Sequence, residues 1–211
     1  MSDIRVNALV LKAIDYSEKD KLLTLLTLER GKLTARIRGC KSPKSKLRFA
    51  ASPLSYNEYV LVKRADRYTV TGSSQKENFY EISDDINKFY SASLILELAN
   101  RLTVDNQECR EIFIDVLKLL NLLSYHNVRP EIIAIRAMTA LMKAAGYAIV
   151  INECAICGSE DIGYFSCLSG GTVCVKDARA GDIKLRADLI QLLTSVINFK
   201  DEELGNIDAE M

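Results

Sequence analysis

Four of the six cysteines lie within 21 residues, in the segment CAICGSEDIGYFSCLSGGTVC (154–174). Their spacing is Cys154-x2-Cys157-x9-Cys167-x6-Cys174. A CxxC pair followed by glycine is typical of a zinc knuckle, in which the turn directs backbone N–H groups toward two thiolates. The four cysteines are therefore a candidate Zn²⁺ site. With four protein ligands the metal would have no open position, so its role would be structural.

The second cysteine pair requires a particular hairpin. If Gly170-Gly171 forms a two-residue turn, Cys167 and Cys174 lie opposite each other on antiparallel strands. Such residues are about 4.5–5.5 Å apart on one face. Asp177 could replace Cys167 as the fourth ligand if the Cys167 side chain points away. Two alternatives stay open: a knuckle that holds no metal, and a redox-active pair.

Composition indicates an ordinary globular chain, with 48% hydrophobic and 27% charged residues. No stretch approaches the roughly 20 apolar residues that span a bilayer. The amino terminus also lacks the basic, apolar and small-residue regions of a signal peptide. We therefore expect a cytosolic protein without a membrane partner. Disulfides are disfavoured in that compartment, which strengthens the metal interpretation of the cysteines.

Catalytic motifs are missing from the sequence. The single histidine, His126, has no cysteine or serine motif beside it, and there is neither a Walker A sequence nor a G-x-G-x-x-G fingerprint. A hydrolase or nuclease needs a carboxylate cluster or a nucleophile with its base. We therefore expect no catalytic residues and a function other than that of an enzyme.

Charge is unevenly distributed although the formal net charge is zero. Residues 1–75 hold 15 Lys and Arg against 7 Asp and Glu, and residues 76–211 hold 13 against 21. A basic front and an acidic back indicate that the front binds a polyanion. The alternative is an asymmetry that serves solubility only.

The positive charge is densest in RIRGCKSPKSKLRF (36–49), which no acidic residue interrupts. Its glycine, serines and proline predict a flexible connection, which could follow phosphates without reading bases. Further cations near the next turn could extend this surface: Lys63, Arg64 and Arg67. Aromatic side chains that could serve as base platforms are Phe49, Tyr56, Tyr59 and Tyr68. The alternative is a solvated linker without a ligand.

Strand patterns fill the first 75 residues. We expect strands at 4–16, 21–29, 32–38, 54–65 and 67–74, separated by polar or glycine turns. In KLTARIR (32–38), apolar Leu33, Ala35 and Ile37 alternate with polar residues, which predicts one buried and one cationic face. Five short strands in this length suit a small barrel or a strongly bent sheet.

Helical periodicity replaces the strand pattern after residue 83. We expect helices at 86–102, at 109–125 with Asp105 as N-cap candidate, at 131–147 after Pro130, and at 186–199. The acidic pair Asp84-Asp85 fits a helix start. The predicted class is α+β in two parts: residues 1–78 and an all-helical domain, 79–211. The cysteine module, at about 150–180, is inserted in the second.

A family resemblance joins these features. The run YSEKDKLLTLLTLERGKLTARIRGCKSPKSKL (16–47) combines Y-x-E-x-D, T-x-x-x-G-K and R-G-x-x-x-P-K-S, and a helical part with CAICG…YFSCLSGGTVC follows. This order closely resembles the bacterial DNA repair protein RecO family over most of the chain.

The resemblance implies an amino-terminal five-stranded OB-fold barrel and a carboxy-terminal helical domain. It also implies a recombination mediator in the cytoplasm, at the nucleoid, which binds single- and double-stranded DNA and anneals complementary strands. The implied partners are RecR, the acidic C-terminal tail of single-stranded DNA-binding protein and, indirectly, RecA.

The resemblance also assigns site residues. DNA contact is carried onto the basic strand-and-loop region, which comprises Arg30, Lys32, Arg36, Arg38, Lys41, Lys44, Lys46 and Arg48. Candidate contacts for the acidic partner tail are Arg101, Arg110, Arg129 and Arg136. The competing hypothesis is a zinc-stabilised adaptor that binds proteins through its acidic helical half and DNA only incidentally.

Overall fold

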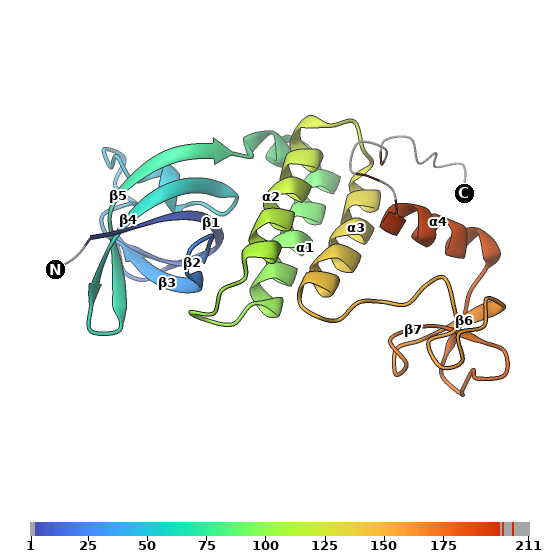
Figure 1. Ribbon diagram of the computed structural model, residues 1–211. Coiled ribbons are helices and arrows are strands. Elements are labelled where there is room, and N and C mark those ends of the chain that lie inside the picture. The colour runs from blue at the N-terminus through green and yellow to red at the C-terminus, as the bar shows by residue number, and fades with distance from the viewer. Residues whose placement is uncertain (1–2, 199, 201–203, 205–211) are drawn as a thin grey trace.

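The computed structural model describes residues 3–198, 200 and 204. Figure 1 shows the strands of the first part at one end of the molecule, helices in the middle and a small strand-containing module at the other end. The first part contains β1 (Asp3–Asp15), β2 (Lys21–Thr27), β3 (Gly31–Ile37), the 3-10 helix η1 (Phe49–Ala51), β4 (Ser55–Arg64) and β5 (Arg67–Asn78). The second contains η2 (Tyr80–Asp84), α1 (Ile86–Leu102), α2 (Arg110–Tyr125), α3 (Pro130–Ala144), β6 (Ile162–Ser166), β7 (Gly171–Cys174), β8 (Ile183–Lys184) and α4 (Ala187–Asn198).

The first five strands close into a barrel in the order β1-β2-β3-β5-β4. All neighbours are antiparallel except β3 and β5, whose parallel pairing joins Ala35 to Tyr68 and Arg36 to Thr69. Along β3 the apolar side chains Leu33, Ala35 and Ile37 are buried in the barrel core. The predicted alternation along this strand is therefore confirmed.

The basic segment between β3 and β4 is more structured than predicted. Successive turns and η1 occupy it, and Cys40, Ala50 and Ala51 are buried in the barrel core. The Lys41 backbone N–H also donates to the Lys19 carbonyl over 3.2 Å, which ties the segment to the β1–β2 turn. The predicted flexible connection is therefore attached to the barrel at both ends, because these small apolar residues cover its core.

Helices α1, α2 and α3 pack against one another beside the barrel, as Figure 1 shows. Asp85 is the N-cap of α1, since its carboxylate accepts hydrogen bonds from the backbone of Asn87 and Lys88. Pro130 occupies the first turn of α3 as predicted. The prediction of Asp105 as N-cap of α2 was wrong.

Asp105 instead faces the barrel. Its carboxylate lies 3.7 Å from Lys32 Nζ, and the N-cap position of α2 belongs to Cys109. The Lys32 ammonium group also donates to the Asn100 carbonyl over 2.7 Å. A β-carbon on Gly31 would lie 1.8 Å from the Gln107 carbonyl oxygen, and Gly31 has a φ of +66°. The β2–β3 turn is therefore docked against the α1–α2 connection.

One apolar core runs from the barrel into the helices. It includes Leu9, Leu11 and Leu26 from the barrel together with residues of all four helices and η2. The predicted boundary at residues 78/79 falls between the end of β5 and η2. Residues 1–2, 199, 201–203 and 205–211 of the predicted domains lie outside the described residues. No helix among the described residues combines the length and hydropathy needed to cross a bilayer.

The cysteine module is a three-stranded sheet in the order β7-β6-β8. The predicted hairpin register was wrong: Ser166 pairs with Gly171, and Ile162 rather than Cys167 lies opposite Cys174. Residues 167–170 form the turn, and Gly171 begins β7. The physical reason is that the segment at Val150 packs against the start of β7. A β-carbon on Gly171 would lie 2.2 Å from the Val150 carbonyl oxygen, so Gly171 is required inside the strand and is not part of the turn.

Candidate nucleic-acid interface and metal centre

A cavity of about 420 Å³ opens on the barrel between the β1–β2 turn and the β4–β5 turn. We call it the arginine cleft. It is lined by Tyr16, Leu22, Thr34, Arg36, Arg38, Arg64, Asp66, Arg67, Tyr68 and Thr69. The two turns, β2, β3 and β5 all contribute, and the pairing of Arg36 with Thr69 brings β3 and β5 together. Four guanidinium groups and two phenol rings thus line one cavity.

A buried carboxylate organises one wall of the arginine cleft. Asp20 Oδ1 accepts the Gly39 backbone N–H over 2.8 Å, and Oδ2 accepts Arg36 Nε over 2.9 Å. The Gly39 N–H and then the Arg36 guanidinium hold the pKa of Asp20 below its ordinary value. The Asp20 carbonyl closes the β1–β2 turn by accepting the Tyr16 N–H over 3.0 Å. Asp20 therefore joins this turn to β3 and the start of the basic segment.

The two aromatic rings of the arginine cleft differ in exposure. The Arg36 guanidinium carbon lies 4.9 Å from the centre of the Tyr16 ring, and Tyr16 is 53% exposed. Tyr68 is half-buried against the barrel core, and Lys63 Nζ lies 5.5 Å from its ring centre. Tyr16 is thus the ring that is more accessible to a ligand.

A second cluster of ligand-type atoms lies in the cysteine module. Four potential ligand atoms lie within 4.8 Å of one another: the Sγ atoms of Cys154, Cys157 and Cys174 and a carboxylate oxygen of Asp177. Cys157 Sγ is 3.8 Å from Cys174 Sγ, and Asp177 Oδ2 is 3.2 Å from Cys154 Sγ and 3.3 Å from Cys174 Sγ. Cys167 is exposed in the β6–β7 turn and is not a member of this cluster.

The cluster fits a small tetrahedral cation. Zn–S bonds of about 2.3 Å hold two sulfurs of a tetrahedron roughly 3.8 Å apart, and a shorter Zn–O bond brings the oxygen slightly closer. Cys154-x2-Cys157 and Cys174-x2-Asp177 have the same spacing, so each pair spans one turn. The four donors therefore form a possible metal-binding site with three thiolates and one carboxylate.

Local hydrogen bonds already favour one thiolate. Burial disfavours it, but the N–H groups of Cys157, Cys174 and Ile156 outweigh burial and hold the pKa of the Cys154 thiol below its ordinary value. The Asp177 carboxylate, chiefly, and the neighbouring sulfurs raise the pKa of Cys157. A bound dication would reverse the second effect, because it favours deprotonated ligands.

The comparisons with known proteins cover both halves of the chain. The family model described as "Recombination protein O N terminal" matches residues 1–79, and "Recombination protein O C terminal" matches residues 83–210. The chain belongs to the DNA repair protein RecO family. Its RecO relatives are named as DNA repair proteins, and neither family description denotes a catalytic enzyme.

Individual RecO relatives match over nearly the whole chain. The DNA repair protein RecO of Acetivibrio thermocellus is 29% identical over 99% of this chain and 84% of the relative. That of Caldanaerobacter subterraneus is 32% identical over 98% of this chain and 85% of the relative. That of Caldicellulosiruptor bescii is 26% identical over 100% of this chain and 86% of the relative.

The eight residues that the RecO resemblance assigned to DNA contact lie in different regions of the structure. Arg36 and Arg38 line the arginine cleft, whereas Arg30 and Lys32 lie at the opposite end of β3, beside the helices. On the basic segment, Lys41 pairs with Asp15 over 2.7 Å. The other three cations of this segment are exposed: Lys44, Lys46 and Arg48. The eight residues thus do not form one continuous patch.

The four arginines assigned to the partner tail are also dispersed in this RecO chain. Arg101 and Arg110 lie where α1 ends and α2 begins, whereas Arg129 precedes α3 at the other end of the helices. Arg136 Nη1 donates to the carbonyls of Val196 and Ile197, which fastens α3 to α4. They do not line a single groove.

Sequence reasoning gave no role to Tyr16, which lines the arginine cleft of the RecO chain, or to Asp20, which holds Arg36 beside it. Both belong to the motif Y-x-E-x-D, which was a signal that could have found them. Of the predicted aromatic platforms, Tyr59 is fully buried and its hydroxyl donates to the Ala50 carbonyl over 2.7 Å. Tyr56 stacks edge-on against Phe113 in the junction with the helices.

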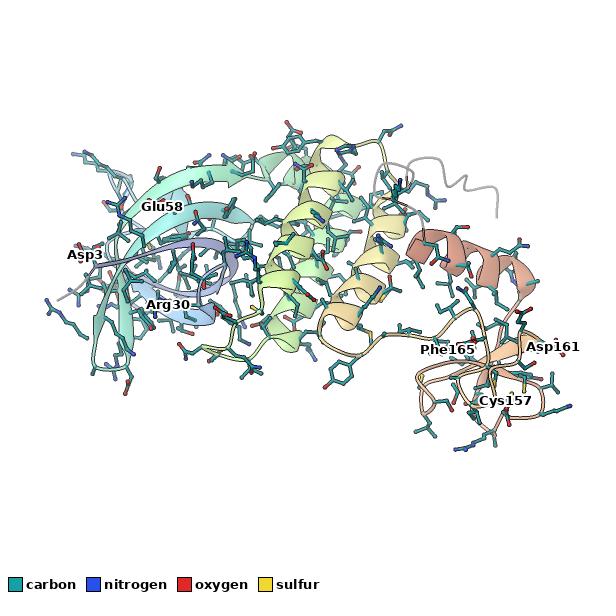
Figure 2. All side chains as sticks on the ribbon, viewed as in Figure 1. Asp3, Arg30, Glu58, Cys157, Asp161 and Phe165 are labelled. Atoms are coloured by element: carbon teal, nitrogen blue, oxygen red, sulfur yellow. The ribbon has the colours of Figure 1, made fainter. Side chains whose placement is uncertain are left out.

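The two candidate sites are far apart. Figure 2 shows Cys157, Asp161 and Phe165 in the small module, at the opposite end of the molecule from Asp3, Arg30 and Glu58 of the barrel. The cysteine and aspartate cluster therefore does not line the arginine cleft. Any metal there would act on the module that it holds.

Proposed function

We propose that this RecO chain is a non-catalytic DNA-binding recombination mediator that binds single- and double-stranded DNA and anneals complementary strands. The observation that carries the proposal is the arginine cleft. Four guanidinium groups from three chain segments converge on one open cavity. Within the described residues, Arg38 and Arg67 form no ion pair, so both are available to phosphates.

The position of the cleft supports an OB-fold mode of binding. OB-folds are five-stranded barrels that bind oligonucleotides over strands 2 and 3, between the loop joining strands 1 and 2 and the loop joining strands 4 and 5. The arginine cleft lies over β2 and β3 and is flanked by the β1–β2 and β4–β5 turns. We therefore assign residues 1–78 to an OB-fold DNA-binding domain and residues 79–211 to a helical domain.

Annealing requires charge screening and no bond chemistry. One strand in the arginine cleft would have its phosphates partly neutralised by Arg38, Arg64 and Arg67. The exposed cations of the basic segment, Lys44, Lys46 and Arg48, would then lower the repulsion of a second strand. In this proposal the arginine cleft binds the first DNA strand, and the basic segment promotes its pairing with the second.

Zinc is the metal that best fits the cluster in the cysteine module. Cys154, Cys157, Cys174 and Asp177 would hold it, and Zn²⁺ prefers thiolates in tetrahedral geometry. The hydrophobic cluster inside the module contains three buried residues, Cys154, Val173 and Cys174. A core of this size does not stabilise a module without a further constraint. We therefore propose a structural role for the metal.

The partners belong to the proposal on the basis of family membership. They are RecR, the acidic tail of single-stranded DNA-binding protein and, through these, RecA, in the cytoplasm at the nucleoid. Arg101 and Arg110 are exposed where α1 ends and α2 begins, and Arg129 is exposed at the other end of the helices, so we propose them as two separate candidate contacts for an acidic tail. Arg136 is the weakest of the four, because its guanidinium group already binds carbonyls of α4.

The proposal predicts that the protein accelerates annealing of complementary oligonucleotides. Changing Lys44, Lys46 and Arg48 together to Ala is expected to lower the annealing rate about tenfold at low salt, since about three phosphate contacts are lost. Stopped-flow fluorescence with a donor and quencher pair measures this rate. Annealing at the spontaneous rate in the presence of wild-type protein would contradict the proposal. An unchanged rate for the variant would show that the basic segment does not contribute to annealing.

A second candidate is a protein-interaction adaptor with incidental DNA binding. A cavity of about 510 Å³ between the barrel and α1 favours it, with Leu11, Leu54, Phe79, Phe89 and Leu96 in its lining. The annealing assay separates the two candidates, because an adaptor leaves the spontaneous rate of annealing unchanged.

A further inference from the structure

We infer that the arginine cleft contains a subsite for one unpaired nucleotide, in which Tyr16 stacks on the base while Arg38 and Arg67 bind the adjoining phosphates. The inference rests on the proposed function and deepens it, since it makes the cleft selective for single strands. It joins two features of the same cavity: an open aromatic ring and guanidinium groups without an ion pair among the described residues.

The Tyr16 ring is held in place before any ligand binds. The Tyr16 N–H donates to the Asp20 carbonyl over 3.0 Å, which fixes the backbone of the turn. The Arg36 guanidinium lies over the ring at 4.9 Å, and Asp20 in turn holds that guanidinium through Nε at 2.9 Å. Ring, guanidinium and carboxylate thus form one connected unit. A side chain fixed in this way loses little conformational entropy on binding.

Exposure shows where a base could lie. Tyr16 remains 53% exposed although Arg36 covers part of it, whereas the other ring of the cleft, Tyr68, is half-buried against the barrel core. A base on the open side of Tyr16 would complete a stack of base, phenol ring and guanidinium group. Bases stack on aromatic side chains with little sequence preference, because every base has a π-face.

Arg36 consequently has a different role from its neighbours. Its guanidinium group is committed to Asp20, which neutralises much of its charge, so it acts as a positioning residue for Tyr16. Arg38 directly follows β3, Arg67 begins β5, and both side chains are exposed. They supply the positive charge that a phosphodiester on either side of the stacked base requires.

Single-strand selectivity follows from this geometry. In a duplex both faces of each base are already stacked on neighbouring bases, so Tyr16 has no face to bind. A duplex can contact the cleft arginines through its phosphates only. Tyr16 is therefore expected to contribute to the affinity for single strands and not to the affinity for duplexes.

The test compares full-length wild type, Tyr16→Ser and Tyr16→Phe by fluorescence anisotropy. Three labelled probes of equal length are used: oligothymidylate, its duplex with oligoadenylate, and an abasic oligomer that keeps every phosphate. Tyr16→Ser is expected to weaken oligothymidylate binding about 5- to 150-fold, the loss of one base–aromatic stack. It should leave the affinity for the duplex and the abasic probe within about twofold, since these lack an accessible base face.

Tyr16→Phe is the matched control, because it keeps the ring that stacks and removes only the hydroxyl group. It is expected to bind oligothymidylate within about twofold of wild type. Equal losses on all three probes with Tyr16→Ser, or an unchanged affinity for oligothymidylate, would overturn the inference while the proposed function stands. If wild type binds none of the probes at low salt, the proposed function and the inference both fail.

Discussion

Cys154→Ser is expected to abolish metal binding and to unfold the cysteine module while the barrel and the α1–α3 helices stay folded. Structural zinc in small peptides contributes about 10–16 kcal/mol of apparent binding free energy, which appears as folding free energy. Cys154 is both a candidate ligand and one of the three buried residues in the hydrophobic cluster of the module. The bound Zn²⁺ is expected to fall from about one per chain to below about 0.2.

Atomic emission spectrometry on protein purified in reducing buffer measures the metal, and limited proteolysis between residues 146 and 185 reports the fold of the module. Cys167→Ser is the matched control, because it removes the same atom from an exposed turn residue outside the cluster. It should retain the metal and the protease resistance. Metal below about 0.2 per wild-type chain, or equal losses in both variants, would contradict the assignment.

The double variant Arg38→Ala/Arg67→Ala is expected to bind single-stranded DNA about 100-fold more weakly than wild type at low salt. Each charged hydrogen bond contributes about 1.5 kcal/mol, which corresponds to roughly tenfold in affinity. Both side chains are exposed on the arginine cleft, so their removal is not expected to disturb the barrel core. Fluorescence anisotropy with a labelled oligonucleotide measures the change.

The control for this variant removes the same charge elsewhere. Lys184→Ala/Arg186→Ala takes two exposed cations from the segment before α4, which Figure 1 places at the opposite end of the molecule from the barrel. Its affinity should stay within about threefold of wild type, since such distant charges are screened beyond the Debye length. A similar loss in both variants would mean that net charge alone, without the cleft, sets the affinity.

Regular elements were predictable from the sequence because their signals are local. The alternation in β3, the periodic apolar residues of α1 and the proline of α3 each depend on neighbours within a few positions. The N-cap of α1 was also recognisable, since the Asp85 carboxylate accepts hydrogen bonds from the backbone N–H groups of Asn87 and Lys88 in the first turn. These features require no knowledge of the rest of the chain.

Contacts between distant segments were not predictable in the same way. Gly170-Gly171 has the composition of a two-residue turn, but Gly171 is needed inside β7, where the Val150 carbonyl approaches it. Lys32 has the charge of a DNA contact, but it binds the Asn100 carbonyl and Asp105. In each case the contact is made by a residue of another element, and the sequence near the glycine or the lysine does not indicate it.

The candidate sites show both situations. The metal cluster was nearly complete from spacing, and Asp177 was a named substitute for Cys167 because it lies three residues after Cys174. The arginine cleft was only partly visible, since its residues come from five segments that the closed barrel brings together. The basic segment was conspicuous in the sequence, whereas Tyr16 and Asp20 acquire their roles only beside Arg36.

The most direct measurement of DNA binding by the arginine cleft is the salt dependence of single-strand affinity for wild type and Arg38→Ala/Arg67→Ala. Wild-type affinity should fall linearly on logarithmic axes as salt rises, by about 0.7 per phosphate contact. The double variant should lose about 1.4 of that slope, because two contacts are removed. Identical slopes for the two proteins, or a wild-type affinity that does not respond to salt, would contradict the assignment of the cleft as the DNA-binding site.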